Sequence, residues 1–494
     1  MFVRPRTEGS RVREKALLTW KNACSRGTQN QERKGSLKVH RSQSVRHAKV
    51  TTDGEGLVSH AGTALLAEMA DRSGLTQAMS VAMGDCGIAW RVHDPGVVLT
   101  HLAVAIADGA DCLSKLAVLR NQEALFGPVA SHPTAWRAVE AVASVELAGI
   151  DTARAAARGR IWAAGGAPKS VTLDFDATLV DAYSEKQDAK PNYKRGFGFH
   201  PLGVWCDETN EALAGMLRPG NAGANSAADH VKMLDAALAQ LPERWRAGHG
   251  PGDEPAEVLH PLLARADSAG ATHGFVDALV ERNIDFSIGF DVDGRVRDAL
   301  MLAQEEDWVP AVEADGSDRP GAWVTELTKL VDLGTWPAGS RLICRREWPH
   351  PGAQLSLFDT SEGFRHTCFL TRSAGKKSKP APLELRQRRH ARVEDRIRCA
   401  KACGLRNFPF EEFVRNETWL AMTMLAQDLL AWTAMMCLDG DLAKAEPATI
   451  RYQLLHVAAR VARRGRDLYL RIDEAWPWRD QLDTAFDRLR TALC

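Results

Sequence analysis

Residues 171–179 (Val-Thr-Leu-Asp-Phe-Asp-Ala-Thr-Leu) constrain the fold more than any other stretch of this sequence. Every odd position of the run is apolar, whereas the even positions are Thr, Asp, Asp and Thr. Because side chains alternate between the two faces of a β-strand, this pattern predicts a strand with one face in the core and with Asp174 and Asp176 on the other face. Two carboxylates this close repel each other unless a cation lies between them, so they indicate a metal site. An edge strand with a solvated polar face would produce the same pattern.

The rest of the chain indicates an α/β protein with several parts. Residues 57–157 have apolar side chains at helical spacing, broken at Ser73-Gly74 as in a helix–turn–helix, although any small helical bundle would show such a break. From Ser170 to Phe290 strand and helix patterns alternate, and a stretch rich in Gly, Pro and Trp then precedes further helices. We expect a basic, disordered extension (1–51), a helical domain (52–160), an α/β domain in two parts (165–290, and 379–494 with the C-terminal helices) and a mostly β insertion between those parts (291–378).

Basic residues are concentrated in two blocks, although the chain is neutral overall with 63 Lys and Arg and 63 Asp and Glu. Residues 1–50 contain 13 Lys and Arg against 3 Glu, and residues 372–401 contain 11 against 3 acidic residues. Such blocks suit a polyphosphate ligand, because each neutralised phosphate releases a condensed counterion. A solvated tail or helix face would have the same composition.

The cysteines and the apolar stretches indicate a cytoplasmic protein. The 10 cysteines form no paired framework, and Cys399 and Cys403 lack a second Cys/His pair at zinc-finger spacing, so we expect free thiols and no structural zinc. The basic N-terminus has no apolar signal segment. The most apolar stretch, residues 413–438, is interrupted by charged residues such as Arg415 and Asp428. It therefore predicts a buried amphipathic helix rather than a membrane span, and we expect no membrane partner.

Two further acidic residues stand where α/β proteins place ligand-facing groups. Asp267 ends the apolar segment 258–266, which predicts a strand, and small residues then turn the chain into a helix. The same aspartate could instead cap that helix. Glu394 lies on the helix predicted over residues 383–403, with Lys401 on the same face.

The Glu394 helix has an excess of positive charge around this one acidic side chain. Its arginines are Arg386, Arg388, Arg389, Arg392, Arg396 and Arg398. Their charge calls for anions that the local sequence does not supply, so the helix suits a site that binds a metal next to phosphates. An exposed helix with salt bridges is the alternative interpretation.

Together these motifs resemble the DDE-type transposases of bacterial insertion sequences, and in particular the DDE group 1 transposases. The likeness extends from about Thr52 to the C-terminus. It rests on the acidic motifs Asp174-Phe-Asp-Ala-Thr-Leu, Leu263-Ala-Arg-Ala-Asp-Ser-Ala-Gly and Arg392-Val-Glu-Asp-Arg-Ile-Arg. Four further blocks match: Phe199-His-Pro-Leu, Leu217-Arg-Pro-Gly-Asn, Gly404-Leu-Arg-Asn-Phe-Pro and Asn416-Glu-Thr-Trp-Leu.

The resemblance implies an RNase H-like catalytic domain, with a mixed five-stranded sheet flanked by helices and a β insertion before the glutamate helix. A helical DNA-binding domain would precede it. The resemblance also implies that Asp176, Asp267 and Glu394 are the catalytic residues and hold two Mg²⁺ (or Mn²⁺) ions. The family pattern of aspartate, any residue and threonine selects Asp176 with Thr178 over Asp174, which would support Asp176 or replace it as a ligand.

The glutamate helix departs at two positions from the family members that pass through a DNA hairpin. Those members have Tyr-x-x-Arg-x-x-x-Glu-x6-Lys. Here Glu394 and Lys401 keep this spacing, but Gln387 and His390 replace the tyrosine and the arginine. The resemblance implies that Lys401 binds a phosphate near the cut. The further candidates for phosphate binding are Arg386, Arg389, Arg392 and Arg398.

The function implied by the resemblance is transposition. The chain would bind the ends of an insertion sequence as a homodimer, cleave DNA there and transfer the 3′ ends to target DNA. Its partners would be double-stranded DNA of the terminal inverted repeats and of the target. Two other functions fit the same motifs: an RNase H-like nuclease without strand transfer, and a DNA-binding repressor of the element without catalysis. The presence of all three acidic residues argues against the repressor.

Overall fold

The computed structural model describes residues 50–494, apart from residues 85, 87–91, 354, 374–377 and 466. Within the chain, residues 55–494 form one compact unit. The basic extension expected over residues 1–51 lies almost wholly outside the described residues.

A nine-stranded sheet runs through this unit, with the strand order β10-β11-β12-β13-β9-β8-β2-β6-β7. In chain order its strands are β2 (Val171–Ala177), β6 (Leu202–Cys206), β7 (Ala212–Met216), β8 (Leu262–Ala266), β9 (Asp285–Phe290), β10 (Val309–Val312), β11 (Asp318–Glu326), β12 (Arg341–Glu347) and β13 (Arg365–Arg372). Strand β8 pairs in parallel with both β2 and β9, and the other neighbouring pairs are antiparallel. The carboxyl ends of β2, β8 and β9 therefore lie at the same end of the sheet.

The two faces of β2 contact different helices, as the alternating sequence predicts. Phe175, on the apolar face, lies 5.0 Å from the ring of Phe275 in α11 (His273–Glu281) and 6.3 Å from the ring of His230 in α9 (Ala227–Ala239). Asp174, on the other face, contacts His390, which precedes α15 (Arg392–Ala400). Asp174 is only 1% exposed, so the polar face of the strand is buried rather than solvated. A carboxylate at such a position needs charged or hydrogen-bonding partners.

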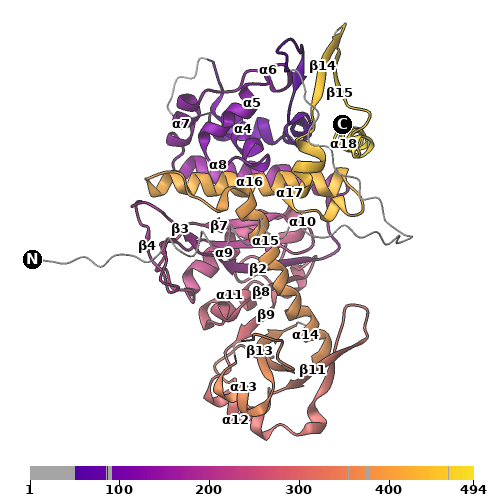
Figure 1. Ribbon diagram of the computed structural model, residues 1–494. Coiled ribbons are helices and arrows are strands. Elements are labelled where there is room, and N and C mark those ends of the chain that lie inside the picture. Colours follow the sequence, from indigo (N-terminus) through magenta and orange to yellow (C-terminus); the bar gives the residue numbers. More distant parts are fainter. Residues whose placement is uncertain (1–49, 85, 87–91, 354, 374–377, 466) are drawn as a thin grey trace, which may run out of the picture. The chain divides into compact units, whose positions relative to one another are not determined.

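A group of helices precedes the sheet in the chain. They are α2 (Ala64–Arg72), α3 (Leu75–Ala82), α4 (Pro95–Ala107), α5 (Ala117–Arg120), α6 (Glu123–Phe126), α7 (His132–Glu140) and α8 (Ser144–Ile161). The break expected at Ser73-Gly74 separates α2 from α3, and Gly74 has a left-handed backbone (φ 73°) that glycine adopts without strain. The long helix α16 (Phe413–Cys437) lies between these helices and strand β7 (Figure 1).

The segment 291–378, expected as a mostly β insertion, contains strands β10–β13, which extend the central sheet because β13 pairs with β9. The same segment includes α12 (Gly294–Leu302) and α13 (Leu357–Glu362). The C-terminal part differs from the expectation of helices alone, since β14 (Ala459–Arg464) and β15 (Asp467–Ile472) form a hairpin that pairs with β1 (Leu57–Val58). The alternating run that forms β15 is short and lies between strong helical patterns.

The remaining elements are short or follow the sheet. A second small sheet consists of β3 (Val180–Asp181), β5 (Phe197–Phe199) and β4 (Lys190–Pro191). The helices not yet named are α10 (Glu243–Arg246), α14 (Pro380–Arg388), α17 (Pro447–Ile450) and α18 (Arg479–Ala492). The helix expected over residues 383–403 is formed by α14 and α15, joined by a single 3₁₀ turn at Arg389–Ala391.

Helix α16 is a core helix. Among the described residues it is the one helix long and apolar enough to cross a membrane by length and composition, yet 78% of its apolar window is buried inside the protein. The helix is therefore buried, as predicted from the sequence, but on nearly all sides rather than along one face, since residues 422–433 are all buried.

A buried network of charges joins α16 to the preceding helices and to the sheet. Asp428 of α16 accepts hydrogen bonds from Arg154 (2.9 Å) and Arg158 (2.8 Å) of α8 and from the backbone N–H of Ala212 in β7 (3.0 Å). Arg158 also pairs with Glu211 at 2.8 Å, and all of these charged side chains are at most 1% exposed. Because each charge has several partners, the network fixes three elements relative to one another.

Replacing Asp428 with alanine should destabilise the protein strongly, because Arg154 and Arg158 would lose a buried partner. Breaking a buried ion pair typically costs about 3–5 kcal/mol. The expected result is that the protein unfolds at a much lower urea concentration, and tryptophan fluorescence measures this unfolding midpoint. Asp439→Ala is the control, since this exposed aspartate just beyond α16 pairs with Arg488 at the surface and its loss should leave the midpoint unchanged. Equal midpoints for Asp428→Ala and wild type would contradict the structural role of the network.

Candidate active site

The three predicted acidic residues lie on elements that converge at one end of the sheet. Asp176 is near the carboxyl end of β2, and Asp267 directly follows β8. The parallel register pairs Phe175 with Ala266, so Asp176 and Asp267 occupy neighbouring positions one residue further along. Glu394 lies in the first turn of α15, which contacts β2. The sheet register and this helix therefore bring together side chains that are far apart in the sequence.

The protonation of Asp176 reflects this convergence. The pKa of Asp176 is raised to about 6: burial is the main cause and the negative charges of Asp267 and Glu394 add to it, whereas His390 and the Ala177 backbone N–H oppose the shift. That N–H donates to Asp176 Oδ1 at 2.7 Å. Asp267 and Glu394 are exposed. Asp176 is thus a carboxylate whose ionised form is disfavoured in the absence of a cation.

The three carboxylates do not close on one point. Among the described residues, ligand atoms from three His, Cys, Asp or Glu side chains come within 4.8 Å of one another in a different group, His60, Asp108 and His456. One ion bound at about 2.1 Å from each ligand needs a closer set of oxygens than the three acids provide. Two ions about 3.5–4 Å apart suit a wider set of carboxylates. The donor atoms are all oxygens, which suits Mg²⁺ or Mn²⁺.

Asp174 lies behind these acids and is held in a charge network. Arg265 of β8 donates to both carboxylate oxygens of Asp174, at 2.8 and 2.6 Å, and also pairs with Asp207 at 2.9 Å. His390 Nδ1 lies 2.9 Å from Asp174 Oδ1. Asp174 and Arg265 are register partners across β2 and β8. No local pattern in the sequence gives Arg265 or Asp207 a role, and His390 stands out there only as a departure from the pattern of the glutamate helix.

Thr178, which the family pattern associates with Asp176, lies just past the end of β2. Its backbone N–H donates to the carbonyl oxygen of Pro201 at 3.1 Å. This bond holds the chain as it leaves the strand. Asp267 also caps the turn that follows it, since its carboxylate accepts from the Ala269 N–H at 3.0 Å. The capping role anticipated as an alternative for Asp267 therefore coexists with its place beside Asp176.

Two further histidines lie within electrostatic reach of Asp267. Burial lowers the pKa of His200 and of His230, and in both cases the charge of Asp267 partly opposes that shift. His200 belongs to the Phe199-His-Pro-Leu block, and its Nδ1 lies 3.3 Å from the Ala222 carbonyl oxygen. His230 Nδ1 lies 2.8 Å from the carbonyl oxygen of Ser226. His230 also packs on Phe175 and Phe275, on the apolar face of β2.

The predicted phosphate-binding residues fall into two groups. Lys401 Nζ lies 3.3 Å from the carbonyl oxygen of Leu179, just beyond β2, and burial lowers the pKa of this lysine. Arg389 is exposed, and Arg392 is half exposed and pairs with Asp207 at 3.2 Å. These three cations lie on the glutamate helix or directly before and after it.

Arg386 and Arg398 are engaged elsewhere. Arg386 donates to the hydroxyls of Ser373 (2.8 Å) and Thr371 (2.7 Å). Arg398 pairs at the surface with Asp395 (2.9 Å) and Glu446 (2.7 Å). Their contacts are with the protein itself. Binding of phosphate by these two arginines remains a prediction.

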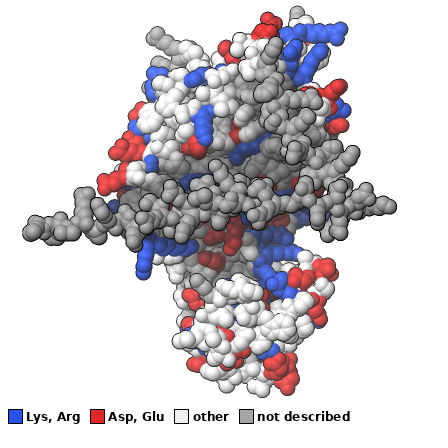
Figure 2. Space-filling view, viewed as in Figure 1, with Lys and Arg blue, Asp and Glu red and all other residues white. Residues whose placement is uncertain are grey.

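The surface around the acids has mixed charge. In the view of Figure 2, acidic side chains gather at mid-height, over the region of β2, β8 and α15, and basic side chains flank them. A negative centre with a positive surround suits a negatively charged ligand that contacts the acids through a bound cation and contacts the surrounding basic side chains directly.

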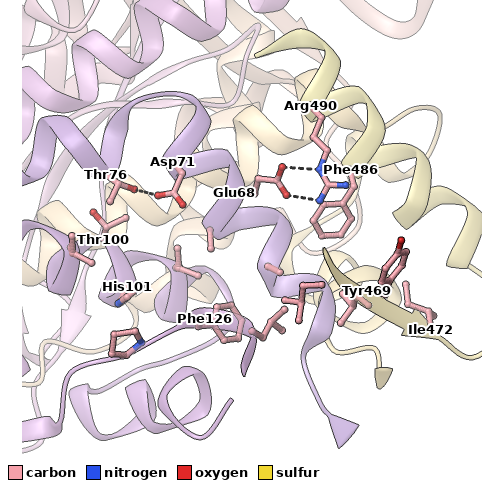
Figure 3. A pocket seen from close by; sticks show the side chains of 18 of the residues that line it. Glu68, Asp71, Thr76, Thr100, His101, Phe126, Tyr469, Ile472, Phe486 and Arg490 are labelled. Atoms are coloured by element: carbon pink, nitrogen blue, oxygen red, sulfur yellow. Dashed lines mark hydrogen bonds and ion pairs between the residues drawn. The ribbon is translucent and has the colours of Figure 1, made fainter. Parts of the chain in front are cut away.

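A cavity of about 810 Å³ lies elsewhere, lined by α2, α4, α18 and β15 (Figure 3). Its charged and polar groups are satisfied by one another: Arg490 donates to both oxygens of Glu68 at 2.8 and 2.9 Å, and Thr76 donates to Asp71 at 2.6 Å. The remaining lining is largely apolar. The cavity therefore lacks the converging polar groups of a catalytic site.

Replacing Asp174 with alanine should destabilise the protein, because Arg265 would remain buried with one charged partner fewer. The expected cost is about 3–5 kcal/mol, measured as a fall in the urea midpoint. Asp181→Ala, at an exposed position of β3, is the control and should leave the midpoint unchanged. A stable Asp174→Ala protein would exclude the positioning role of this aspartate.

Replacing Asp176 with asparagine should stabilise the protein when a chelator removes divalent cations. The folded protein protonates Asp176 near pH 6, whereas the unfolded chain does so near 3.8, so the ionised carboxylate destabilises the fold above pH 6. At pH 7.5 the variant should exceed wild type in unfolding free energy by up to about 3 kcal/mol. This gap should shrink as the pH falls through 6 and vanish below about 3.8. Urea denaturation across this range measures it, and a gap that grows toward acid pH would contradict the assignment.

Comparisons with known proteins identify the family of the chain. Residues 40–494 match the family model of the transposase DDE domain group 1. No curated protein sequence matches the chain. Among solved structures, the chain is similar to a piggyBac transposase synaptic complex with hairpin DNA, at 9% identity and a TM-score of 0.39, over 80% of this chain and 77% of that chain. Since the family model spans most of the sequence, the chain belongs to the DDE group 1 transposase family.

Proposed function

We propose that this transposase cleaves DNA at the ends of its mobile element and transfers the 3′ ends to target DNA, with Asp176, Asp267 and Glu394 as ligands of two divalent metal ions. The observation that carries the proposal is the convergence of these acids through the β2–β8 register and the contact of α15 with β2. The elevated pKa of Asp176 supports it, because a bound cation would relieve the repulsion that contributes to the shift.

The strand order supports an RNase H-like catalytic domain. Strands β7-β6-β2-β8-β9 form a mixed five-stranded set, antiparallel on one side of β2 and parallel on the other. Helices α9 and α11 contact this set through Phe175, and α15 contacts β2. In this interpretation β10–β13 are an insertion that lengthens the sheet between β9 and the glutamate helix.

The metal ions would be held by carboxylate oxygens at the carboxyl ends of β2 and β8 and on α15. When bound, two Mg²⁺ or Mn²⁺ ions activate the attacking oxygen and stabilise the leaving 3′-oxygen in phosphodiester chemistry. The contribution of the chain is to fix the positions of the three acids. Arg265 and His390 do so by binding Asp174 behind them.

Three cations are suited to bind the DNA backbone beside the acids. Lys401 follows α15 and lies against Leu179, next to the end of β2 that carries Asp176. Arg389 and Arg392 precede Glu394 and are accessible to solvent. Point charges and guanidinium groups at these positions would orient a phosphodiester relative to the acids.

We assign recognition of the terminal repeats to the helical region 52–160, and we propose that a homodimer holds two DNA ends. Both statements rest on membership of the DDE transposase family. The buried network of Asp428 supports a fixed relation between these helices and the sheet, since it joins α8, α16 and β7.

The test is a cleavage and joining assay with a DNA that carries the element's flanking ends, a target plasmid and Mn²⁺ or Mg²⁺. Asp267→Ala and Glu394→Gln should reduce cleavage about a thousandfold or more, since loss of a metal ligand removes several kcal/mol of transition-state stabilisation. Both residues are exposed, so the variants should fold and still bind DNA.

Asp395→Asn is the matched control, because Asp395 neighbours Glu394 on α15 but pairs with Arg398 at the surface. It should retain activity. Products that are cut but not joined to target would indicate a nuclease without strand transfer. Binding of the ends without any cleavage by wild type would indicate a repressor, and full activity of Asp267→Ala would refute the site itself.

A further inference from the structure

A second cluster of metal-ligating side chains lies outside the acidic site. His60 precedes the 3₁₀ turn Ala61–Thr63, Asp108 ends α4, and His456 follows the helical turn Arg451–Leu455 that leads to β14. One ligand atom from each lies within 4.8 Å of the other two. These ligands come from three chain segments that the fold brings together, so local sequence spacing does not reveal the cluster.

Asp108 is the centre of the cluster. His60 Nδ1 lies 2.7 Å from Asp108 Oδ2, and His456 Nε2 lies 3.2 Å from Asp108 Oδ1. Thr63 donates its hydroxyl to Oδ1 at 2.5 Å. Burial alone would raise the pKa of Asp108, but the hydrogen bonds from His456, His60 and Thr63 hold this pKa below its usual value. The carboxylate is therefore ionised and oriented, as a ligand must be.

His60 is held in a conformation that its local sequence does not favour. Its backbone is left-handed, with φ 53° and ψ 34°, a conformation that is strained for a residue with a Cβ atom. Its ring packs on that of His456, with centroids 3.9 Å apart. Strain of this kind persists where surrounding contacts require one side-chain position, and it is concentrated at ligand sites.

We propose that His60, Asp108 and His456 bind one transition-metal ion, with Zn²⁺ as the best match. Two imidazole nitrogens and one carboxylate oxygen are a donor set that Zn²⁺ prefers and Mg²⁺ does not. At Zn–N and Zn–O distances of about 2.0–2.2 Å, tetrahedral ligand atoms lie roughly 3.3 Å apart. The separations of 2.7 and 3.2 Å run from the two histidines to different oxygens of Asp108, and the three ligand atoms lie within 4.8 Å of one another, so the cluster must rearrange around the ion.

The surroundings suit a three-ligand site with access from solvent. The side chains of His60 and His456 are 26% and 35% exposed, while that of Asp108 is 5% exposed, so a water molecule can complete the coordination. Ligation uses Nδ1 of His60 and Nε2 of His456. Without metal, Nε2 of His456 donates to the backbone carbonyl oxygen of Asp108 at 3.0 Å, so metal binding replaces this hydrogen bond and shifts the ring proton to Nδ1. Thr63 keeps its hydrogen bond to the carboxylate and fixes its orientation.

The ion would link the C-terminal hairpin to the helices near the start of the compact unit. His456 lies directly before β14, and β15 of the same hairpin forms one wall of the cavity in Figure 3. Asp108 ends α4, which lines the opposite part of that cavity. The bound metal is therefore structural, and it fixes this hairpin independently of the acids at β2 and β8.

The test measures zinc in full-length protein that also has Asp267→Asn and Glu394→Gln, so that the acidic site does not contribute. After exposure to Zn²⁺ and desalting, elemental analysis should find one zinc per chain. Replacement by Co²⁺ should give visible absorption bands typical of a low-coordinate site with nitrogen ligands. Chelator should lower the Tm of this protein.

His456→Gln separates metal binding from simple hydrogen bonding, because the glutamine amide can still donate to Asp108. This variant and His60→Asn should lose the zinc and the response of the Tm to chelator. His366→Asn is the matched control, since His366 pairs with Asp359 at 3.0 Å and no third ligand joins them among the described residues, and it should retain the zinc. Absence of zinc in the parent protein, or equal zinc in His456→Gln and His366→Asn, would overturn the proposal and leave a hydrogen-bonded cluster.

Discussion

The buried pair of Asp174 and Arg265 fixes the arrangement on which the candidate active site depends. The two residues face each other across the parallel strands β2 and β8. A slip of one residue would turn Asp267 to the opposite face of the sheet from Asp176. It would also leave a buried charge without its partner, at a cost of about 3–5 kcal/mol. Two residues that do not themselves belong to the proposed metal site therefore specify the register that brings Asp176 and Asp267 together.

The same pair determines where the glutamate helix lies. His390 binds Asp174 and stands one helical turn before Glu394, while Arg392 and Arg396 contact Asp207 beyond β6. Burial and, to a smaller extent, the charges of Asp267 and Glu394 raise the pKa of Asp176, so the three acids repel one another and cannot hold themselves together. The contacts of Asp174 with Arg265 and His390, behind the acids, offset this repulsion. The acids are therefore held near one another before any cation binds.

The sequence predicts those features that depend on local patterns, and misses those that depend on distant pairing. The alternation over 171–179 and the helical spacing over 413–438 were sufficient for β2 and α16, because burial on one face imposes a period. Arg265, 91 residues from Asp174, and His390, 216 residues from it, gave no local signal. The pairing of β13 with β9 is likewise a property of the sheet. The metal-binding cluster around Asp108 follows the same rule, since its histidines lie 48 and 348 residues away.

Helix α16 connects the central sheet to the helices that precede it in the chain. It packs on β7 and on α4, α2 and α8, so it is the element through which the sheet and the preceding helices are joined. Its Asp428 binds arginines of α8 and the backbone of β7 in a dry environment, where each charge strongly restricts the positions of its partners. Attachment through α16 and through the arginines of α8, which also bind Glu211 and the Ala212 carbonyl directly, has a mechanical implication for a transposase. DNA bound by the helices of residues 52–160 would be presented to the acids at a fixed offset, so the cutting position would depend on these contacts rather than on a flexible linker.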